Sequence, residues 1–506
     1  MTLAWILFLI YMAGTTYLGW MGYKRTANFG SFAIGMGDLH PAVVGITLAA
    51  SVASAATFII NPGFVYVHGL AGFMHLTVAV AVGFCSMLLI LSFRFRRLGE
   101  ASKALTMPHW IGNRYQSKWF ALYFAVVNLF AVAFVVLIVG GLSIVMQQLL
   151  GLSNVLSLVI IIGFVTGYVF LGGTYAHVFT NTLQGSLMLL VTVVILASGV
   201  HLFFEGGGFF TRIAEINPHL LAWINPESDL FNSLFSIYFS GILIGAALVC
   251  QPHILTKALY VKSDRAVRQY LIFGILALIL FFLLPGAGFY ALLTVPPEQL
   301  VDAASGAFRQ DLVMTMYVKN AFPDWLFTLI GVVLLAAGMS TLDGILVSLS
   351  TITANDFVVT VMEKFSPTPR SEEEQLALAY KVSHVVLVIV ALAAFLICLD
   401  PPKLLGIFGQ VGVYGMAVAA VPPLLSGVWF ERVSLSLMWL ASLAALLVHF
   451  LLYFYGAALF PNSGLTFANP GVTASLALLV TALPAVVVAG MLGRVKDEGK
   501  RIKDEG

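Results

Sequence analysis

Charged side chains are scarce in this chain. Asp, Glu, Lys and Arg together make up 9% of the 506 residues, against roughly 25% in soluble domains. Hydrophobic residues make up 60%, and apolar runs long enough to cross a bilayer as helices follow one another along nearly the whole chain. The runs are continuous rather than alternating, which disfavours a β-barrel. The composition therefore predicts an all-α polytopic membrane protein without a soluble domain.

Cysteines and the sequence motifs of hydrolytic enzymes are also scarce. The three cysteines, Cys85, Cys250 and Cys398, all fall in apolar runs, which argues against disulfides and cysteine metal sites. The sequence contains no Walker A motif, no HExxH and no GxSxG. We therefore expect no enzymatic activity, and we expect any transport by this chain to depend on an ion gradient.

We predict 13 membrane spans. The first lacks a basic n-region and a small-residue cleavage site, so we expect it to be a retained helix rather than a signal peptide. The predicted spans are residues 2–22, 38–66, 70–93, 119–149, 153–173, 176–203, 229–256, 266–294, 323–355, 376–399, 404–426, 433–456 and 471–493.

Basic residues separate clearly when these spans are threaded with the N-terminus outside and the C-terminus inside. Lys and Arg concentrate in the cytoplasmic segments of membrane proteins, and this threading leaves only Arg212, Arg309, Lys319 and Lys403 of the 25 basic residues outside. Lys257, which follows the seventh span, is counted with the inner loops. The net charge of +2 then reflects cytoplasmic loops and gives no indication of nucleic-acid binding.

Two predicted spans carry glycine and proline in their apolar middle. The second contains Asn61-Pro62-Gly63, and the seventh contains Gln251-Pro252-His253. Each opens a set of five spans, and because five is odd the two sets would be inverted in the membrane. Interrupted spans at matching positions of two halves are typical of the midplane site of an inverted-repeat transporter. The alternative is two ordinary proline kinks.

A polar cluster lies in the ninth predicted span. Ser340, Thr341 and Asp343 occur there within one turn of otherwise apolar sequence. An ionisable residue inside a membrane is by default a candidate functional residue, and hydroxyl, carboxylate and freed carbonyl oxygens are ligands of hard cations. The cluster therefore indicates an ion site. The alternative is that the hydroxyls bond to carbonyls one turn back and that Asp343 makes a structural helix contact.

The order and spacing of several motifs resemble the sodium:solute symporter family over residues 20–450. This resemblance implies the leucine-transporter architecture of five-plus-five inverted helices within a single transmembrane domain, residues 1–506. The first repeat would be residues 38–203 and the second residues 229–426, with one extra helix before (2–22) and two after (433–493). The motifs are Ala50-Ser51-Val52-Ala53-Ser54, Asn61-Pro62-Gly63, Leu171-Gly172-Gly173 leading to Thr180-Asn181-Thr182-Leu183-Gln184, Gln251-Pro252-His253, and Ala337-x-x-Ser340-Thr341-x-Asp343.

The resemblance also implies a principal sodium site. Its ligands would be the backbone carbonyls of Ala50, Ala53 and Ala337 and the hydroxyls of Ser340 and Thr341. The spacing i, i+3, i+4 places the last three on one helix face. Five neutral oxygens suit a monovalent ion that must bind and then leave.

Asn181 marks a departure from the family pattern. Many members carry an aspartate there, and some use it in a second sodium site that faces the Ser340 helix. Asp343 lies where a hydroxyl lies in members with the second site. With Ser340 and Asn181 it either rebuilds a second cation site or carries a proton. The alternative is a packing contact in which Asp343 bonds to Asn181 or Gln184.

Candidate solute contacts come from the break in the second span and its neighbours. A lone His75 or Asn128 in a helix bundle is more often a satisfied interhelical hydrogen bond. Positions where relatives carry aromatic residues in the seventh span are apolar here, at Ile244 and Leu248. The candidates are Ser54, Ala56, Thr57, His75, Asn128, Leu248, Gln410 and Tyr414.

The stretch from Gln251 to Leu255 is more similar to the proline, pantothenate and carboxylate branches than to the sugar branch. This implies a small carboxylate-bearing solute, an amino acid or a monocarboxylate. The N–H groups and positive dipole end of a broken helix would suit a carboxylate, and no arginine lies deep in a span to supply a formal counter-charge. We therefore expect a multi-pass cell-membrane symporter that couples inward sodium flux to solute uptake, without a nucleic acid or an obligate protein partner.

Three other functions stay open from the sequence. A symporter of the same fold could be coupled to protons. A membrane solute sensor could use the fold, although the chain ends in a short charged tail without a kinase. A passive channel or facilitator would need no ion-binding cluster, and Ser340, Thr341 and Asp343 argue against it.

Overall fold

The computed structural model describes residues 2–301, 306–364, 370–402 and 404–492. Over these ranges the regular structure is helical, with two isolated β-bridges and no strand. Ten helical segments are long and apolar enough to cross a membrane, or eleven if the bent pair Phe235–Leu248 and Pro252–Tyr260 counts as one span. The prediction of a helical multi-pass membrane protein is confirmed. The count of 13 spans and their orientation stay predictions.

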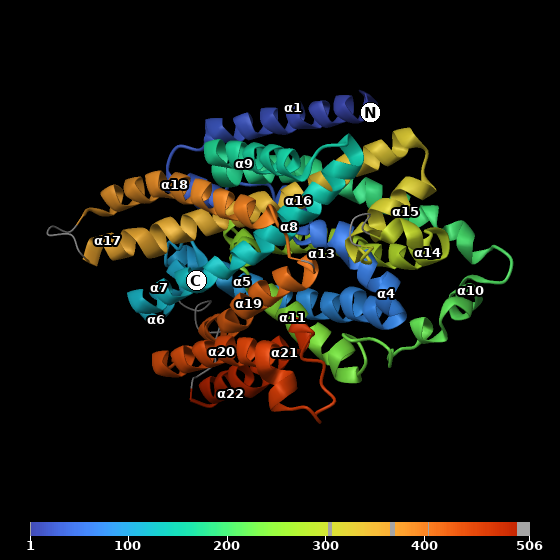
Figure 1. Cartoon of the computed structure of the whole chain (residues 1–506). Helices are drawn as coiled ribbons and strands as arrows, with labels where there is room; N and C mark the ends of the chain where they lie inside the picture. Colours follow the sequence, from blue (N-terminus) through green and yellow to red (C-terminus); the bar gives the residue numbers. More distant parts are fainter. Residues whose placement is uncertain (1, 302–305, 365–369, 403, 493–506) are drawn as a thin grey trace.

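Most helices lie side by side along one direction (Figure 1). The helices of eight or more residues, and the two short helices needed below, are α1 (Thr2–Arg25), α3 (Pro41–Val52), α4 (Asn61–Phe73), α5 (Val80–Ala101), α6 (Met107–Tyr115), α7 (Lys118–Val127), α8 (Ala131–Leu150), α9 (Asn154–Ser198), α10 (Phe209–Ile216), α11 (Ser240–Leu248), α12 (Pro252–Leu255), α13 (Asp264–Leu283), α14 (Ala287–Thr294), α15 (Val313–Ala321), α16 (Asp324–Ile352), α17 (Thr360–Lys364), α18 (Glu372–Cys398), α19 (Leu405–Trp429), α20 (Leu435–Leu459), α21 (Pro470–Ala477) and α22 (Leu483–Leu492).

Helix α16 lies at the centre of the molecule. Every residue from Ile330 to Val347 is buried, and the helix packs against α3, α8, α9 and α18. A helix that is apolar on all sides is typical of such a central position. The polar cluster at Ser340, Thr341 and Asp343 is therefore enclosed by other helices and is held away from lipid.

Two glycines with positive φ interrupt long helical segments. Gly69 (φ 64, ψ −141) lies within Ala56–Ala101, and Gly173 (φ 47, ψ −132) lies within Asn154–Phe203. A Cβ on Gly69 would stand 2.1 Å from the carbonyl oxygen of Leu220, and one on Gly173 would stand 2.5 Å from the Phe32 ring. Only glycine fits both the dihedral angles and the close approach. Gly69 lies between the second and third predicted spans, and Gly173 is the last residue of the fifth.

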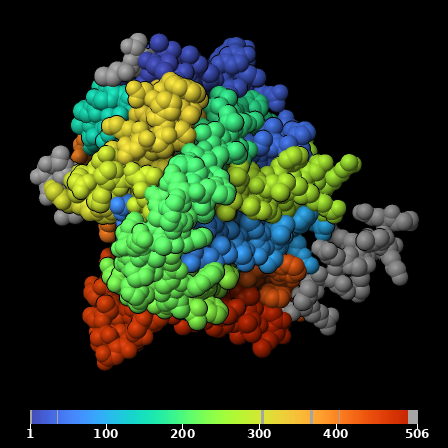
Figure 2. Space-filling model, turned by 90° about the vertical axis from the view of Figure 1, so that its right-hand side faces the viewer, coloured from blue at the N-terminus to red at the C-terminus, as the bar shows by residue number. Residues whose placement is uncertain are grey.

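The connecting segments gather at opposite ends of the bundle. In Figure 1, α6 and α17 lie at the left end, and α10 lies at the right end. Figure 2 views the right end, where the green chain around α10 lies across the face next to the blue and yellow segments. Segments that the sequence threading assigned to one side of the membrane thus share one end of the molecule.

Candidate functional site

The first break in the helices follows α3. The helix ends at Val52, and Ala53 leaves helical geometry (φ −78, ψ 68). The chain resumes in the π-helical turn Ala56–Ile60, and the Ser54 hydroxyl accepts a hydrogen bond from the Ala56 N–H at 3.1 Å. Because the α-helical ladder stops here, carbonyls in the last turn of α3 are free to accept other donors.

Two hydroxyls of α16 contact those freed carbonyls. Ser340 Oγ lies 2.9 Å from Ala50 O and 2.7 Å from Ala337 O. Thr341 Oγ1 lies 3.0 Å from Ser51 O and 3.5 Å from Ala50 O. All of these residues are fully or almost fully buried. The contacts bring neutral oxygens from two helices together at one buried point. Such oxygens are suitable ligands for a hard monovalent cation.

The structure thus joins four of the five predicted sodium ligands, namely Ala50, Ala337, Ser340 and Thr341. Ala53 is buried in the same break, and its carbonyl has no hydrogen bond to this group among the described residues. The assignment of all five to sodium stays a prediction, because carbonyls and hydroxyls of this kind also close on one another in ordinary helix packing.

Asn181 borders the same point from α9. Its Nδ2 donates to Ser340 O at 2.7 Å and to Ser51 Oγ at 3.2 Å. Its Oδ1 is buried and has no partner among the described atoms. Asn181 therefore bridges α3 and α16 beside the candidate ion site and keeps one free acceptor.

Asp343 has different neighbours. Its carboxylate accepts hydrogen bonds from the Tyr168 phenol at 3.0 Å and the Thr180 hydroxyl at 3.2 Å, and His177 Nδ1 lies 2.8 Å away. No hydrogen bond from Asp343 to Ser340, Asn181 or Gln184 occurs in the described part of the chain. The sequence had singled out Asp343, but it gave no reason to select Tyr168 or His177 as its partners.

The second break separates α11 from α12. The two helical pieces are bent by 65°, and Gln251 is extended there (φ −71, ψ 136). Pro252 follows at the first position of α12, where a missing N–H is tolerated. Gln251 Nε2 donates to Leu248 O at 3.0 Å and closes the end of α11.

A cavity of about 110 Å³ lies between the two breaks. Phe84, Phe134 and Phe282 form apolar walls, and Asn61, Gln251 and His253 are polar residues of the lining. Ser51 lines the cavity as well, and its backbone oxygen is bound by Thr341. Six of the eight predicted solute contacts line it: Ser54, Ala56, Thr57, Leu248, Gln410 and Tyr414.

The other two predicted contacts do not line this cavity. His75 is buried, and its Nδ1 lies 2.9 Å from the carbonyl oxygen of Ile237. This is the interhelical hydrogen bond that the sequence gave as the alternative. Asn128 is buried in the short turn between α7 and α8, and its Nδ2 has no partner among the described atoms.

The structure corrects the placement of Lys257. The threading counted it with the solvated inner loops, but its side chain is among the largest fully buried ones, and the residue is 1% exposed. It lies in the 3₁₀ turn Thr256–Tyr260 that continues α12. The hydropathy pattern failed here because the broken span continues inward past Pro252, so its last residues are enclosed by helices that are remote in sequence.

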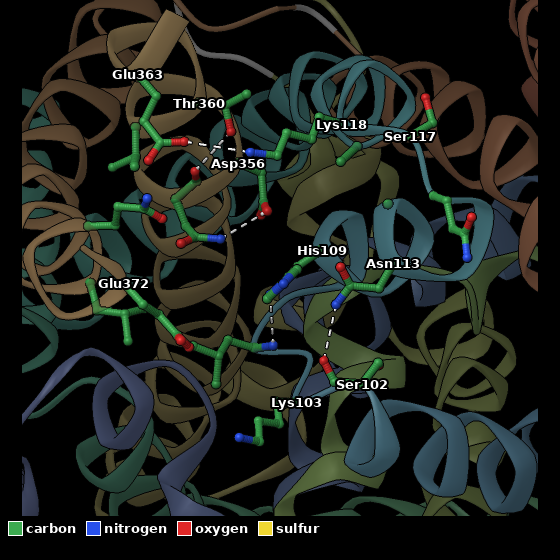
Figure 3. Close-up of a pocket in the computed structure, with 18 residues that line it drawn as sticks. Ser102, Lys103, His109, Asn113, Ser117, Lys118, Asp356, Thr360, Glu363 and Glu372 are labelled. Carbon is green, nitrogen blue, oxygen red and sulfur yellow. Dashed lines mark hydrogen bonds and ion pairs between the residues drawn. The ribbon is translucent and has the colours of Figure 1, made fainter. Parts of the chain in front are cut away.

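A larger cavity of about 740 Å³ is lined in part by residues of α6 and α17, the helices that lie at the left end of the molecule in Figure 1. Figure 3 shows its lining, where Asp356, Glu363 and Glu372 surround one side and Lys103, His109 and Lys118 the other. Lys118 Nζ is 3.8 Å from Glu363 Oε2. Burial lowers the pKa of His109 and so disfavours the charged form of this imidazole. The two cavities have no lining residue in common.

Two relatives of known function match 84% and 50% of this chain. A sodium/pantothenate symporter of Haemophilus influenzae is 23% identical over 430 residues, which are 84% of this chain and 85% of that protein. A high-affinity proline transporter of Bacillus subtilis is 26% identical over 262 residues, 50% of this chain and 53% of that protein.

Solved structures share the fold. A Na⁺-coupled sialic acid symporter in a substrate-bound outward-open state has a TM-score of 0.72 at 17% identity, with 98% of this chain and 99% of that chain covered. A nucleobase-cation-symport-1 family transporter in a closed conformation has a TM-score of 0.52 at 15% identity, with 94% and 98% covered. These likenesses support the leucine-transporter type of fold. The family model of the sodium:solute symporters matches residues 32–441, and the chain therefore belongs to the sodium:solute symporter family.

Proposed function

We propose that this protein couples the inward movement of sodium to the uptake of a small carboxylate-bearing solute. The observation that carries this proposal is the position of Ser51. Its backbone oxygen belongs to the oxygen group with Ser340 and Thr341, and the same residue lines the cavity between the helix breaks. An ion bound by this group would stabilise the end of α3, which forms part of the solute cavity. Ion and solute would then favour the same conformation of α3, and each would strengthen the binding of the other.

The cavity supports a small solute with an apolar part. Its volume of about 110 Å³ is modest, and aromatic residues of α5, α8 and α13 line it together with polar residues of the two breaks. Similar proteins include a sodium/pantothenate symporter, a proline transporter and a Na⁺-coupled sialic acid symporter. Pantothenate, proline and sialic acid all carry a carboxylate. The particular solute is left to the screen described below.

Thirteen spans with the N-terminus outside remain our proposal for the topology. Dividing the two segments interrupted at Gly69 and Gly173 and including the bent pair of α11 and α12 raises the ten apolar segments to 13, and α3 is then the first half of the span broken at Ala53. Five spans, residues 38–203, would form the first repeat and residues 229–426 the second.

Asn181 and Asp343 keep distinct roles in this proposal. Asn181, with its free Oδ1 beside Ser340, is the better candidate for a second cation site. Asp343 is surrounded by donors from α9, so we favour a packing or proton-linked role for it over a role as sodium ligand.

The test is uptake by the purified protein in liposomes. An inward sodium gradient should drive accumulation of the solute above its equilibrium level, and the accumulation should collapse when an ionophore dissipates that gradient. Accumulation that continues in sodium after the gradient is dissipated would contradict coupling. Accumulation that follows an inward proton gradient in the absence of sodium would favour the proton-coupled alternative.

A further inference from the structure

The side chain of Lys257 is buried and has few partners. The residue is 1% exposed, and within the described residues its Nζ donates to one acceptor, the carbonyl oxygen of His253, at 2.6 Å. No described carboxylate lies within 4.0 Å of it. A buried amine with so little compensation favours its neutral form, and an anion that approaches it would stabilise its protonated form. Lys257 therefore calls for an anionic partner.

The residues directly before Lys257 border the solute cavity. Gln251 and His253 both line it and are 3% and 4% exposed. Gln251 Oε1 and His253 Nε2 are buried without a hydrogen-bond partner among the described atoms. Buried polar atoms in native structures usually have partners, so two orphaned atoms on adjoining turns indicate a polar ligand at this end of the cavity.

No acidic residue lines the cavity to repel an anion. Among its described lining residues there is no Asp, Glu, Lys or Arg, so the charge of Lys257, four residues beyond His253, is not offset at the cavity wall. The charge of a protonated lysine in a low-dielectric surrounding acts over a longer range than in water. Its field would favour a negatively charged group beside His253.

Asp343 is the competing partner for Lys257. Asp343 is buried on α16, and α16 packs against α12, the helix that leads into Lys257. However, the carboxylate of Asp343 already has three donors, from Tyr168, His177 and Thr180. Asp343 is thus stabilised by α9, and the ammonium of Lys257 stays available to a second anion.

We propose that His253 and Lys257 form an anion-recognition site at the end of the cavity nearer the predicted inner side, which selects solutes that carry a carboxylate. This inference rests on the proposed function, because it concerns the solute of that transport. His253 would meet the carboxylate in the cavity, and Lys257 would attract it toward the inner side and contact it as that side opens.

The experiment is thermal unfolding of the full-length protein in sodium with pairs of solutes that differ at the carboxyl group. The pairs are propionate and propionamide, lactate and lactamide, L-proline and L-prolinamide, and pantothenate and panthenol. At least one acid should stabilise the wild-type protein more than its neutral-headed partner. Lys257→Met should weaken the apparent affinity for that acid by about tenfold or more, which converts to about 1.4 kcal/mol, and should leave the amide or alcohol unaffected.

Two further variants serve as controls. Lys257→Arg keeps the charge and should retain the preference for the acid. Lys262→Met removes a lysine that is exposed five residues later and should behave as the wild type. Equal stabilisation by acids and their partners, a preference that survives Lys257→Met, or a lack of response to every acid would each overturn the proposal.

The alternative role of Lys257, as a counter-ion of Asp343, makes a different prediction. If Lys257 serves only to neutralise Asp343, Lys257→Met should destabilise the protein without any solute, Asp343→Asn in the same chain should restore the stability, and the acid preference should persist. Sodium-specific stabilisation in the absence of solute is measured in parallel. If it is missing in the wild type, the proposed function fails; if it is present while acids are not preferred, only the anion-recognition site fails.

Discussion

Neighbouring polar residues on α16 contact different helices. Ser340 and Thr341 face the broken end of α3, while Asp343, two residues further along, faces α9. Successive residues in a helix project about 100° apart, so Thr341 and Asp343 project about 200° apart, but Ser340 and Asp343 only about 60°. Residue type and spacing were enough to predict the cluster from the sequence. Which of its residues contact α3 and which contact α9 depends on how these helices pack against α16.

The hydroxyl of Ser340 should be required for the response to sodium. Binding to the folded state alone stabilises a protein by roughly 2.7 kcal/mol at a hundredfold excess of ligand over its dissociation constant. We expect the wild-type protein to unfold at a higher temperature in sodium than in choline, and Ser340→Ala to lose most of this difference. Ser350→Ala is the matched control, because that buried hydroxyl of α16 bonds to Val347 O of its own helix.

Asp343→Asn should act on stability rather than on sodium binding. The change removes the charge from a buried carboxylate with three donors, and loss of one partner from such a group costs on the order of 3 kcal/mol. We expect a lower unfolding temperature by the same amount in sodium and in choline. A selective loss of the sodium response in this variant would instead assign Asp343 to a cation site.

Helices in this protein are interrupted in two chemically distinct ways. The seventh span breaks at Gln251, just before Pro252, and the second breaks at Ala53; freed backbone groups and a cavity are found at these breaks. The break of the second span was predicted at Asn61-Pro62-Gly63, but these residues lie inside the helical segment Ala56–Ala101. Glycines with positive φ break Ala56–Ala101 and Asn154–Phe203, where a neighbouring segment approaches the backbone closely. The proline signal placed the break of the seventh span correctly and that of the second span too late in the chain. Span boundaries were predicted at or next to both glycines, but nothing in the sequence indicated why glycine is required there, because close approach depends on the packed neighbour.

Gly173→Ala should destabilise the protein, whereas Gly163→Ala should not. An alanine at Gly173 would be held at positive φ, which costs roughly 1–2 kcal/mol, and its Cβ would collide with Phe32. Gly163 lies in the same element with nothing within 4 Å of an added Cβ, so alanine there should raise stability by about 0.5–1 kcal/mol through its better helix propensity. Thermal unfolding of both variants measures the contrast. Equal effects would argue that the break at Gly173 tolerates a side chain.

Across the whole molecule, the connecting segments lie at two ends that match the charge asymmetry of the sequence. The segment around α10 covers one end (Figure 2), and α6 and α17 border the large cavity at the other (Figure 3). Because Lys and Arg are retained on the cytoplasmic side, the end with α6 and α17 should be the inner one.

Cysteine labelling can test this orientation. In a background without the three native cysteines, Glu205→Cys in the exposed segment before α10 should react with a membrane-impermeant maleimide added outside intact cells. Glu373→Cys at the exposed start of α18 should react only after the membrane is permeabilised. The reverse pattern would contradict the proposed topology, and labelling of both sites from outside would mean that the number of spans between them is miscounted.

The sequence by itself determined the membrane class, the family, the two broken spans and the hydroxyl cluster, because hydropathy, proline and residue spacing are local properties of a chain. The tertiary structure decided which of these residues meet. It joined Ser340 and Thr341 to Ala50 and Ser51 across about 290 positions of sequence, gave Asp343 its partners on α9, and buried Lys257, which hydropathy had placed in a loop. Contacts of this kind depend on how remote helices pack against one another, and no local pattern along the chain encodes that packing.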